Sequence, residues 1–371
     1  MNTHGLLLQW HVTERCNLRC AHCYQEGYAS EEFSLAELLG VLDQFKELLA
    51  RRRGELRGLP YRGHVTVTGG EPFLRDDFLA LVKCLAAEKG RLTFAILTNG
   101  SMINEAMANR LAELGPSFVQ VSIDGTERTN DSLRAQGAFV QAVSALKHLV
   151  RVRVPAVISF TAQRCNYREF AEVARLGCEL GVDRVWADRL IPWGAAATLR
   201  EQLLSIAETR EFFHIMDDAR AEAERRFGRT KVILSRALQF LVGGGRPYHC
   251  AAGDGLIALL PNGDLLPCRR MPIVVGNVRD RSLSDLYYEN GVLKRLRDHD
   301  RPSRGCEGCK HALQCGGGLR CLSYALTGDP LTADPGCWHA DRSSIQRDAA
   351  LAVRGADCHA VPDVIKDTWA P

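Results

Sequence analysis

Three cysteines near the start of the chain have the spacing of a metal-binding loop. Cys16, Cys20 and Cys23 follow one another at C-x3-C-x2-C intervals, directly after an apolar run at residues 6–12. That run is typical of a buried strand, so the thiols are expected on a loop at its carboxyl end. Iron–sulfur clusters are held by cysteine thiolates. Three of them on one loop would leave one iron of a [4Fe–4S] cluster open to another ligand. On spacing alone, a zinc knuckle or three reduced thiols remains an alternative.

Most other cysteines lie in the last third of the chain. The sequence has 14 cysteines, and seven of them fall between Cys250 and Cys337. No basic segment followed by an apolar core opens the chain, and no apolar run is long enough to span a bilayer. We therefore expect a cytoplasmic protein, in which so many cysteines favour metal over disulfides. Cys84 and Cys178 fall within helical patterns and are expected as small core residues.

The composition limits the class of partner. With 371 residues, of which 46% are hydrophobic, the chain can bury a large core and form two domains. Its 47 basic and 44 acidic residues leave a net charge of +3. This near balance gives no reason to expect nucleic acid or an anionic membrane as the main partner.

Six strand–helix units precede residue 200. Strands are expected near residues 6–12, 64–68, 93–97, 118–123, 154–160 and 182–186, with helical patterns between them. Such alternation predicts an α/β fold with a parallel sheet and helices outside it. A complete barrel needs eight units and about 250 residues. The prediction is therefore a (β/α)6 partial TIM barrel, whose open side would admit a large substrate.

A glycine-rich motif, Gly69-Gly70-Glu71-Pro72, follows the second predicted strand. Two glycines let the backbone approach a ligand closely and adopt positive φ angles. The Glu71 carboxylate beside them suits an ammonium group. Taken alone, the motif is also an ordinary turn.

Together, the cysteine loop and the glycine motif resemble those of radical S-adenosylmethionine (SAM) enzymes. The resemblance implies a [4Fe–4S] cluster on the three thiols, with SAM bound to the open iron. It further implies that Gly69, Gly70 and Glu71 hold the amino group of SAM. One electron from the cluster would cleave SAM to a 5′-deoxyadenosyl radical, which abstracts a hydrogen atom from the substrate.

The same resemblance assigns less specific roles to other strand ends. In this family the fourth strand commonly supplies polar contacts to SAM, which implies such contacts for Ser122 and Asp124. Asn99 would lie near the adenosine, and Arg189 near the adenine or the substrate. His22 occupies a position whose backbone often touches adenine. Each of these residues could equally be a capping, turn or loop residue.

The C-terminal cysteines resemble the SPASM domain, an extension of radical SAM enzymes that carries auxiliary iron–sulfur clusters. Residues 256–268 are typical of a hairpin with an Asn-Gly turn. The zinc alternative suggested by C-x2-C has no use for this hairpin. The resemblance implies an outer cluster on four thiols and an inner cluster on three. The outer set is Cys306, Cys309, Cys315 and Cys337, and the inner set is Cys250, Cys268 and Cys321.

The inner set departs from the family pattern. Leu319 stands where the next cysteine is usual, and the thiol comes at Cys321 instead. The inner cluster would then have an open or non-cysteine ligand, or be altered or absent. His249, His311 and His339 are nearby candidates for that ligand. The run 316–329 most resembles the peptide cyclase of pyrroloquinoline quinone biosynthesis.

The expected organisation is a radical SAM partial barrel over 1–200, a helical bridge over 201–245, a SPASM domain over 246–345 and a tail over 346–371. The resemblance implies an oxidoreductase that cross-links, epimerises or oxidises a peptide or protein. A flavodoxin- or ferredoxin-type electron donor and a separate peptide-recognition protein would be partners. Other radical SAM substrates remain open, among them a sulfatase-type side chain, a haem precursor or a metalloenzyme partner. So does a non-enzymatic iron–sulfur or zinc protein. No catalytic acid or base stands out.

Overall fold

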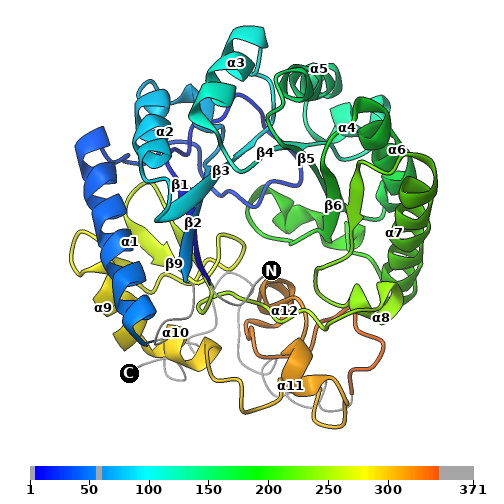
Figure 1. Ribbon diagram of the computed structural model, residues 1–371. Coiled ribbons are helices and arrows are strands. Elements are labelled where there is room, and N and C mark those ends of the chain that lie inside the picture. The colour runs from blue at the N-terminus through cyan, green and yellow to red at the C-terminus, as the bar shows by residue number, and fades with distance from the viewer. Residues whose placement is uncertain (1–4, 56–60, 342–371) are drawn as a thin grey trace.

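The computed structural model describes residues 5–55 and 61–341, in which one curved sheet organises the chain (Figure 1). Its strands lie in the order β10-β9-β8-β1-β2-β3-β4-β5-β6-β7, and β1 to β7 are parallel neighbours. The parallel strands are β1 (Gly5–His11), β2 (Arg62–Thr68), β3 (Leu92–Thr98), β4 (Val119–Ser122), β5 (Ala156–Ala162), β6 (Arg184–Arg189) and β7 (Lys231–Ile233). The predicted α/β partial barrel is thus confirmed.

Helices cover the outside of this sheet, as Figure 1 shows. They are α1 (Leu35–Glu55), α2 (Phe78–Ala87), α3 (Glu105–Leu114), α4 (Glu127–Leu133), α5 (Ala138–Arg151), α6 (Phe170–Leu180) and α7 (Ile206–Arg226). The 3-10 turns η1 (Pro72–Leu74), η2 (Tyr167–Glu169) and η3 (Gly194–Gln202) join them to the strands. Helix α1 begins at the predicted capping box, where Ser34 and Glu37 exchange hydrogen bonds. Its apolar stripe, including Leu38 and Phe45, is buried in the core.

Two elements differ from the sequence prediction. Helix α4 was not predicted, because Glu127–Leu133 is short, polar and without an apolar stripe. The region 201–245, predicted as a helical bridge, carries the expected helix but also a strand. It contains the end of η3, then α7, strand β7 and the short helix α8 (Phe240–Gly243).

The cysteine-rich region is built onto the edge of the barrel sheet. Strand β8 (Leu256–Leu259) pairs in parallel with β1, and β9 (Asp264–Leu266) pairs antiparallel with β8, as the predicted hairpin requires. Strand β10 (Gly276–Asn277) completes this edge. The sheet therefore continues through the proposed domain boundary at residue 245. Because β1 also leads into the cysteine loop, the pairing holds the two cysteine regions in one framework.

Short helices complete the C-terminal region along the open side of the barrel (Figure 1). They are α9 (Leu283–Glu289), α10 (Gly291–Leu296), α11 (Ala312–Cys315) and α12 (Arg320–Thr327). Across residues 5–55 and 61–341, none of the helices has the length and apolar character that a membrane crossing requires. The predicted tail, 346–371, lies outside the described residues.

Candidate active site

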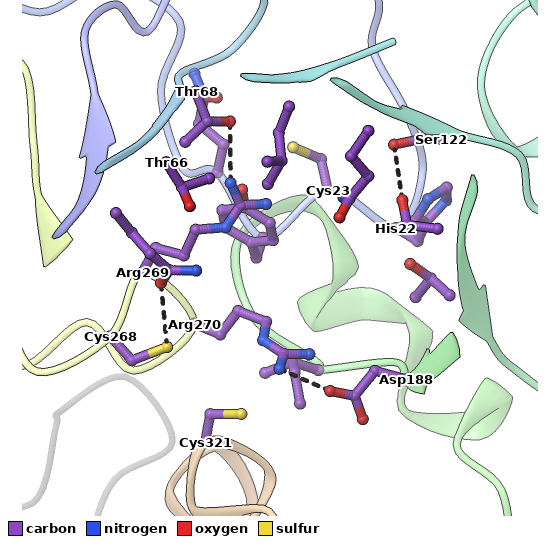
Figure 2. Close-up of a pocket in the computed structure, with 18 of the residues that line it drawn as sticks. His22, Cys23, Thr66, Thr68, Ser122, Asp188, Cys268, Arg269, Arg270 and Cys321 are labelled. Carbon is purple, nitrogen blue, oxygen red and sulfur yellow. Dashed lines mark hydrogen bonds and ion pairs between the residues drawn. The ribbon is translucent and has the colours of Figure 1, made fainter. Parts of the chain in front are cut away.

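A cavity of about 320 Å³ lies inside the curve of the sheet and reaches both cysteine regions (Figure 2). Cys16, Cys20 and Cys23 line it from the loop after β1. Three thiols of the C-terminal region, Cys250, Cys268 and Cys321, line the same cavity. The structure therefore brings together the two predicted sets across one space, with the barrel interior between them.

Polar side chains fill much of the barrel wall around this cavity. The interior of a closed barrel is packed with bulky apolar residues. Here alternate positions on four strands line the cavity with polar groups, and these include Thr66, Thr68, Gln120, Ser122, Ser159, Thr161 and Asp188. Sequence reasoning missed them as a group. A signal for them was present in the sequence. Parallel strands that are covered on both faces are apolar throughout, whereas in these strands polar and apolar residues alternate.

The two glycines of the glycine motif support the stem of the cysteine loop. Gly70 N–H donates to the Thr13 carbonyl oxygen at 2.8 Å, and a Cβ on Gly69 would lie 2.4 Å from that oxygen. A Cβ on Gly70 would lie 2.4 Å from the Arg15 carbonyl oxygen. Neither glycine has a positive φ. The predicted conformational reason is therefore wrong, and the close approach is to the loop backbone, although both glycines also line the cavity.

Glu71 is fully buried beneath this motif, with protein donors around its carboxylate. Oε1 accepts from Thr98 Oγ1 at 2.8 Å and from Phe73 N at 3.4 Å, and Oε2 accepts from Asn99 N at 2.8 Å. Burial raises the pKa of Glu71 to about 7 in spite of these donors. Glu71 is not among the cavity-lining residues. Its carboxylate ties the end of β2 to the end of β3.

Glu71 should therefore make the stability of the protein depend on pH. Its pKa is raised from 4.5 to about 7, so the folded state holds a proton that the unfolded state releases between these values. Stability should fall as pH rises through this window, by about 3 kcal/mol at most. Glu71→Gln should lack this slope. The measurement is the thermal midpoint without SAM at pH 5.5 and 7.5.

The exposed Glu113→Gln on α3 is the control for this experiment, and its pH curve should parallel that of the wild type. A Glu71→Gln curve that also parallels the wild type would contradict the titration of Glu71.

Asp124 holds the cysteine loop in place through contacts with His22 and Arg134. Its fully buried carboxylate accepts from Arg134 Nε at 2.7 Å and from Thr161 N at 2.7 Å, and it contacts His22 Nε2 at 3.0 Å. Burial raises the pKa of Asp124, but Arg134 and His22 outweigh it and hold that pKa well below its usual range. Arg134 Nη1 lies 3.8 Å from Cys20 Sγ. The carboxylate does not line the cavity. The predicted SAM contact of Asp124 is thus corrected to a positioning role.

The other predicted SAM contacts do line the cavity. Ser122 Oγ lies 3.4 Å from Ser159 Oγ on the barrel wall. Asn99 Nδ2 donates to Asn17 Oδ1 at 2.9 Å, which joins the end of β3 to the cysteine loop. Arg189 also reaches the cavity, but its guanidinium is paired with Asp334 of the C-terminal region, with Nη1 at 2.8 Å from Oδ1.

Arginines give the cavity a positive lining that the sequence did not predict as a feature. Besides Arg189, four of them line it, and Asp188 is the single carboxylate among the lining residues that the structure describes. Arg270 Nη2 pairs with Asp188 Oδ2 at 2.7 Å, as Figure 2 shows. The others are Arg134, Arg236 and Arg269. They come from distant parts of the chain, so no local motif marks them.

The four thiols predicted for the outer cluster line a second, smaller cavity. They are Cys306, Cys309, Cys315 and Cys337. His311 and His339 line this second cavity, not the one that holds the inner thiols. His249 stacks on His299 and lines neither cavity. The three predicted histidine ligands of the inner set are therefore not supported, and Leu319 lines the main cavity beside Cys321.

The donor chemistry of both cavities fits iron–sulfur clusters. Burial raises the pKa of Cys20 to about 11, and that of Cys306 and Cys315 to about 12, so these bare thiols need a cationic centre to ionise. Among the described residues, no three His, Cys, Asp or Glu side chains are grouped to hold a single metal ion. The thiols instead surround cavities, and thiolates are the ligands that iron–sulfur clusters use.

An open α/β barrel with thiol groups around its cavity is the arrangement expected of an iron–sulfur protein built on a partial barrel. Comparison with known protein families identifies the family within this class. Residues 10–177 match the Radical SAM superfamily, and residues 250–310 match the SPASM iron–sulfur cluster-binding domain. The chain belongs to the radical SAM superfamily and carries a SPASM domain. It is thus an enzyme that uses a [4Fe–4S] cluster with SAM and binds auxiliary clusters, as predicted.

Similar curated proteins are named for haem biosynthesis. The pre-heme d1 synthase of Dinoroseobacter shibae is 30% identical in a 354-residue alignment that covers 89% of this chain and 85% of that protein. The AdoMet-dependent heme synthase of Nitratidesulfovibrio vulgaris is 26% identical in a 355-residue alignment that covers 91% of this chain and 93% of that protein.

Solved structures share the fold at lower identity. Streptococcus suis SuiB bound to its precursor peptide SuiA has a TM-score of 0.69 at 17% identity, covering 91% of this chain and 76% of that one. The structure titled native anSMEcpe with bound AdoMet and Kp18Cys peptide has a TM-score of 0.69 at 18% identity, covering 94% and 97%. At these identities the likeness shows the fold alone.

Proposed function

We propose that this radical SAM enzyme modifies a haem precursor, a tetrapyrrole with carboxylate side chains. The observation that carries the proposal is the similarity at 26–30% identity, over about nine-tenths of the chain, to proteins named as haem and pre-heme d1 synthases. This substrate was one alternative that the sequence left open. The titles of the structural neighbours describe complexes with peptides, but at 17–18% identity this likeness says nothing about the substrate of the present chain.

In this proposal the residues divide into three groups. The first is the cofactor site, where Cys16, Cys20 and Cys23 hold the [4Fe–4S] cluster. When bound with SAM, that cluster supplies the reduction of SAM and the hydrogen abstraction from the substrate. The Gly69-Gly70 backbone, Asn99 and Ser122 face the cavity where they can contact SAM. Glu71 and Asp124 hold the strand ends and the cysteine loop in place.

The other groups are the two auxiliary sites. Four thiols around the second cavity would hold the outer cluster. Cys250, Cys268 and Cys321 would hold the inner one beside the main cavity. Burial lowers the pKa of Arg270, but Asp188 raises it more than any other group does, and the nearby thiols of Cys321 and Cys268 raise it further. Its charge would stabilise thiolates there. A flavodoxin- or ferredoxin-type donor would supply electrons.

The lining of the cavity agrees with an acidic, largely planar substrate. Three of the five arginines that line the cavity pair with carboxylates, and the remaining two, Arg236 and Arg269, give the lining its positive excess. Tyr24, Tyr248 and Trp186 add aromatic surface. A tetrapyrrole has carboxylates that can pair with the arginines and a flat macrocycle that can stack on the aromatic rings.

A peptide substrate is the second candidate. The run 316–329 resembles that of a peptide cyclase, and this favours a peptide or protein maturase that works with a separate recognition protein.

One assay separates these candidates. The reconstituted protein is incubated anaerobically with SAM, a reductant and either a propionate-bearing tetrapyrrole or a set of short peptides. We expect the tetrapyrrole to raise the rate of 5′-deoxyadenosine formation and to change in mass. Stimulation by a peptide, with an unchanged tetrapyrrole, would overturn the proposal in favour of the second candidate.

A further inference from the structure

In the part of the chain that the structure describes, two of the five cavity arginines have no carboxylate within ion-pair distance. Arg134 is paired with Asp124, Arg189 with Asp334 and Arg270 with Asp188. For Arg236 and Arg269, by contrast, the described part of the chain places no carboxylate within ion-pair distance, 4.0 Å. Within the described residues these two guanidinium groups therefore have no carboxylate in direct contact, although Asp188 lies near enough to Arg236 for the Arg236 charge to help lower the Asp188 pKa, after burial, which raises it, and Arg270.

Arg236 is held by an aromatic platform. It follows β7, and its guanidinium carbon lies 4.3 Å from the centre of the Trp186 ring. Trp186 is itself fixed, because its indole N–H donates to Gln120 Oε1 at 3.1 Å. No protein acceptor takes a bond from the Arg236 guanidinium in the described residues. Stacking sets the plane of the group and leaves its N–H donors at the edge for a ligand.

Arg269 is held in a similar way on the other side of the barrel opening. Its guanidinium carbon lies 4.4 Å from the centre of the Tyr24 ring, and Nη1 donates to Thr68 Oγ1 at 3.0 Å. Figure 2 shows the side chain reaching from beside Cys268 toward Thr68. A guanidinium has five N–H donors, so one bond to a hydroxyl leaves most of them available.

The two arginines approach the cavity from opposite ends of the sheet. Arg236 follows β7, the last strand at one edge, and Arg269 follows β9 near the other edge. We propose that they are two anchor points for two carboxylate groups of one substrate. This inference rests on the proposed function and adds to it the residues that select a dicarboxylate. Arginine suits the role because its planar fork matches a carboxylate with two parallel hydrogen bonds.

A competing role is to balance the charge of a cluster. Arg134 and Arg270 fit that role, since the thiols of Cys20 and of Cys268 and Cys321 act on them. Arg269 is adjacent to Cys268 and lowers the pKa of its thiol, though less than other groups change it. For Arg236, the described residues give a contact with the Trp186 ring and none with a thiol. The test must therefore follow the clusters as well as the ligand.

Binding of a porphyrin with two propionates tests the proposal without turnover. The holoenzyme with SAM and no reductant is titrated with this porphyrin and with its dimethyl ester, and absorbance gives Kd. We expect Arg236→Gln and Arg269→Gln each to weaken diacid binding by about 10- to 100-fold, and the double variant to weaken it further. None should change the affinity for the diester. Arg236→Lys should recover part of the loss.

Arg226→Gln is the matched control, because Arg226 is exposed on α7 and pairs with Glu222. Iron content and the EPR spectrum are recorded for every variant. If the wild type binds no porphyrin, the proposed function fails. If the wild type binds and the Gln variants bind equally well, the anchor role is overturned while the function stands. Weakening by Arg269→Gln that occurs only with loss of iron would assign Arg269 to the cluster and overturn its anchor role.

Discussion

Cys20→Ala is expected to remove about four irons per chain and to reduce 5′-deoxyadenosine formation to background. Cys20 is one of three thiols at the main cavity on the loop after β1, and no fourth cysteine is near in sequence to replace it. A [4Fe–4S] cluster with an open iron has no ligand to spare. The measurement is iron per chain after anaerobic reconstitution, with deoxyadenosine formed from SAM and dithionite.

Cys309→Ala is the matched control for this prediction. Cys309 lines the second cavity, away from the loop after β1. Its loss should remove iron from the outer site but leave SAM cleavage measurable. Equal loss of SAM cleavage in both variants would contradict the division of the thiols into separate sites. Full iron content in Cys20→Ala would contradict the role of Cys20.

Much of the fold could be predicted from local signals. The apolar strands, the Ser34 capping box and the Asn-Gly hairpin each specify an element through nearby residues. The division of the thiols into three sets followed the family pattern. The outer set lines a cavity of its own, whereas the loop set and the inner set share the main cavity. These features needed no knowledge of which strands meet.

The residues that hold the site together were less visible, because their partners lie far away in sequence. Helix α4 has a polar sequence without an apolar stripe, yet its Leu133 carbonyl accepts from Ala21 N–H at 2.8 Å on the cysteine loop. Arg134 directly follows this helix and meets Asp124 and Cys20. A sequence motif specifies which residue type stands at a position. Which hydrogen-bond donors contact that residue depends on the tertiary structure. Asp124 was therefore assigned to SAM when its partners are protein groups.

The partner of Arg189 was likewise not predictable from the sequence, because it lies far away along the chain. The sequence placed Arg189 near the adenine or substrate, whereas its guanidinium forms a buried ion pair with Asp334 across the barrel and the C-terminal region. Asp334 also accepts from Leu319 N and from Gly336 N, each at 2.8 Å. One carboxylate thus fixes the barrel, the segment before Cys321 and the segment before Cys337.

Arg189→Gln should therefore destabilise the protein by about 3–5 kcal/mol, because it leaves the Asp334 charge buried without its cation. The measurement is the apparent Tm of the reconstituted protein. Arg226→Gln breaks an exposed pair and should cost less than about 1 kcal/mol. The double variant Arg189→Gln/Asp334→Asn removes both charges, so its loss of stability should be smaller than the sum of the losses in the two single variants.

An Arg189→Gln midpoint equal to that of the control would show that the ion pair does not join the barrel to the C-terminal region. A lowered midpoint with an altered auxiliary-cluster EPR spectrum is the expected result, since Asp334 positions the chain on both sides of the C-terminal thiols.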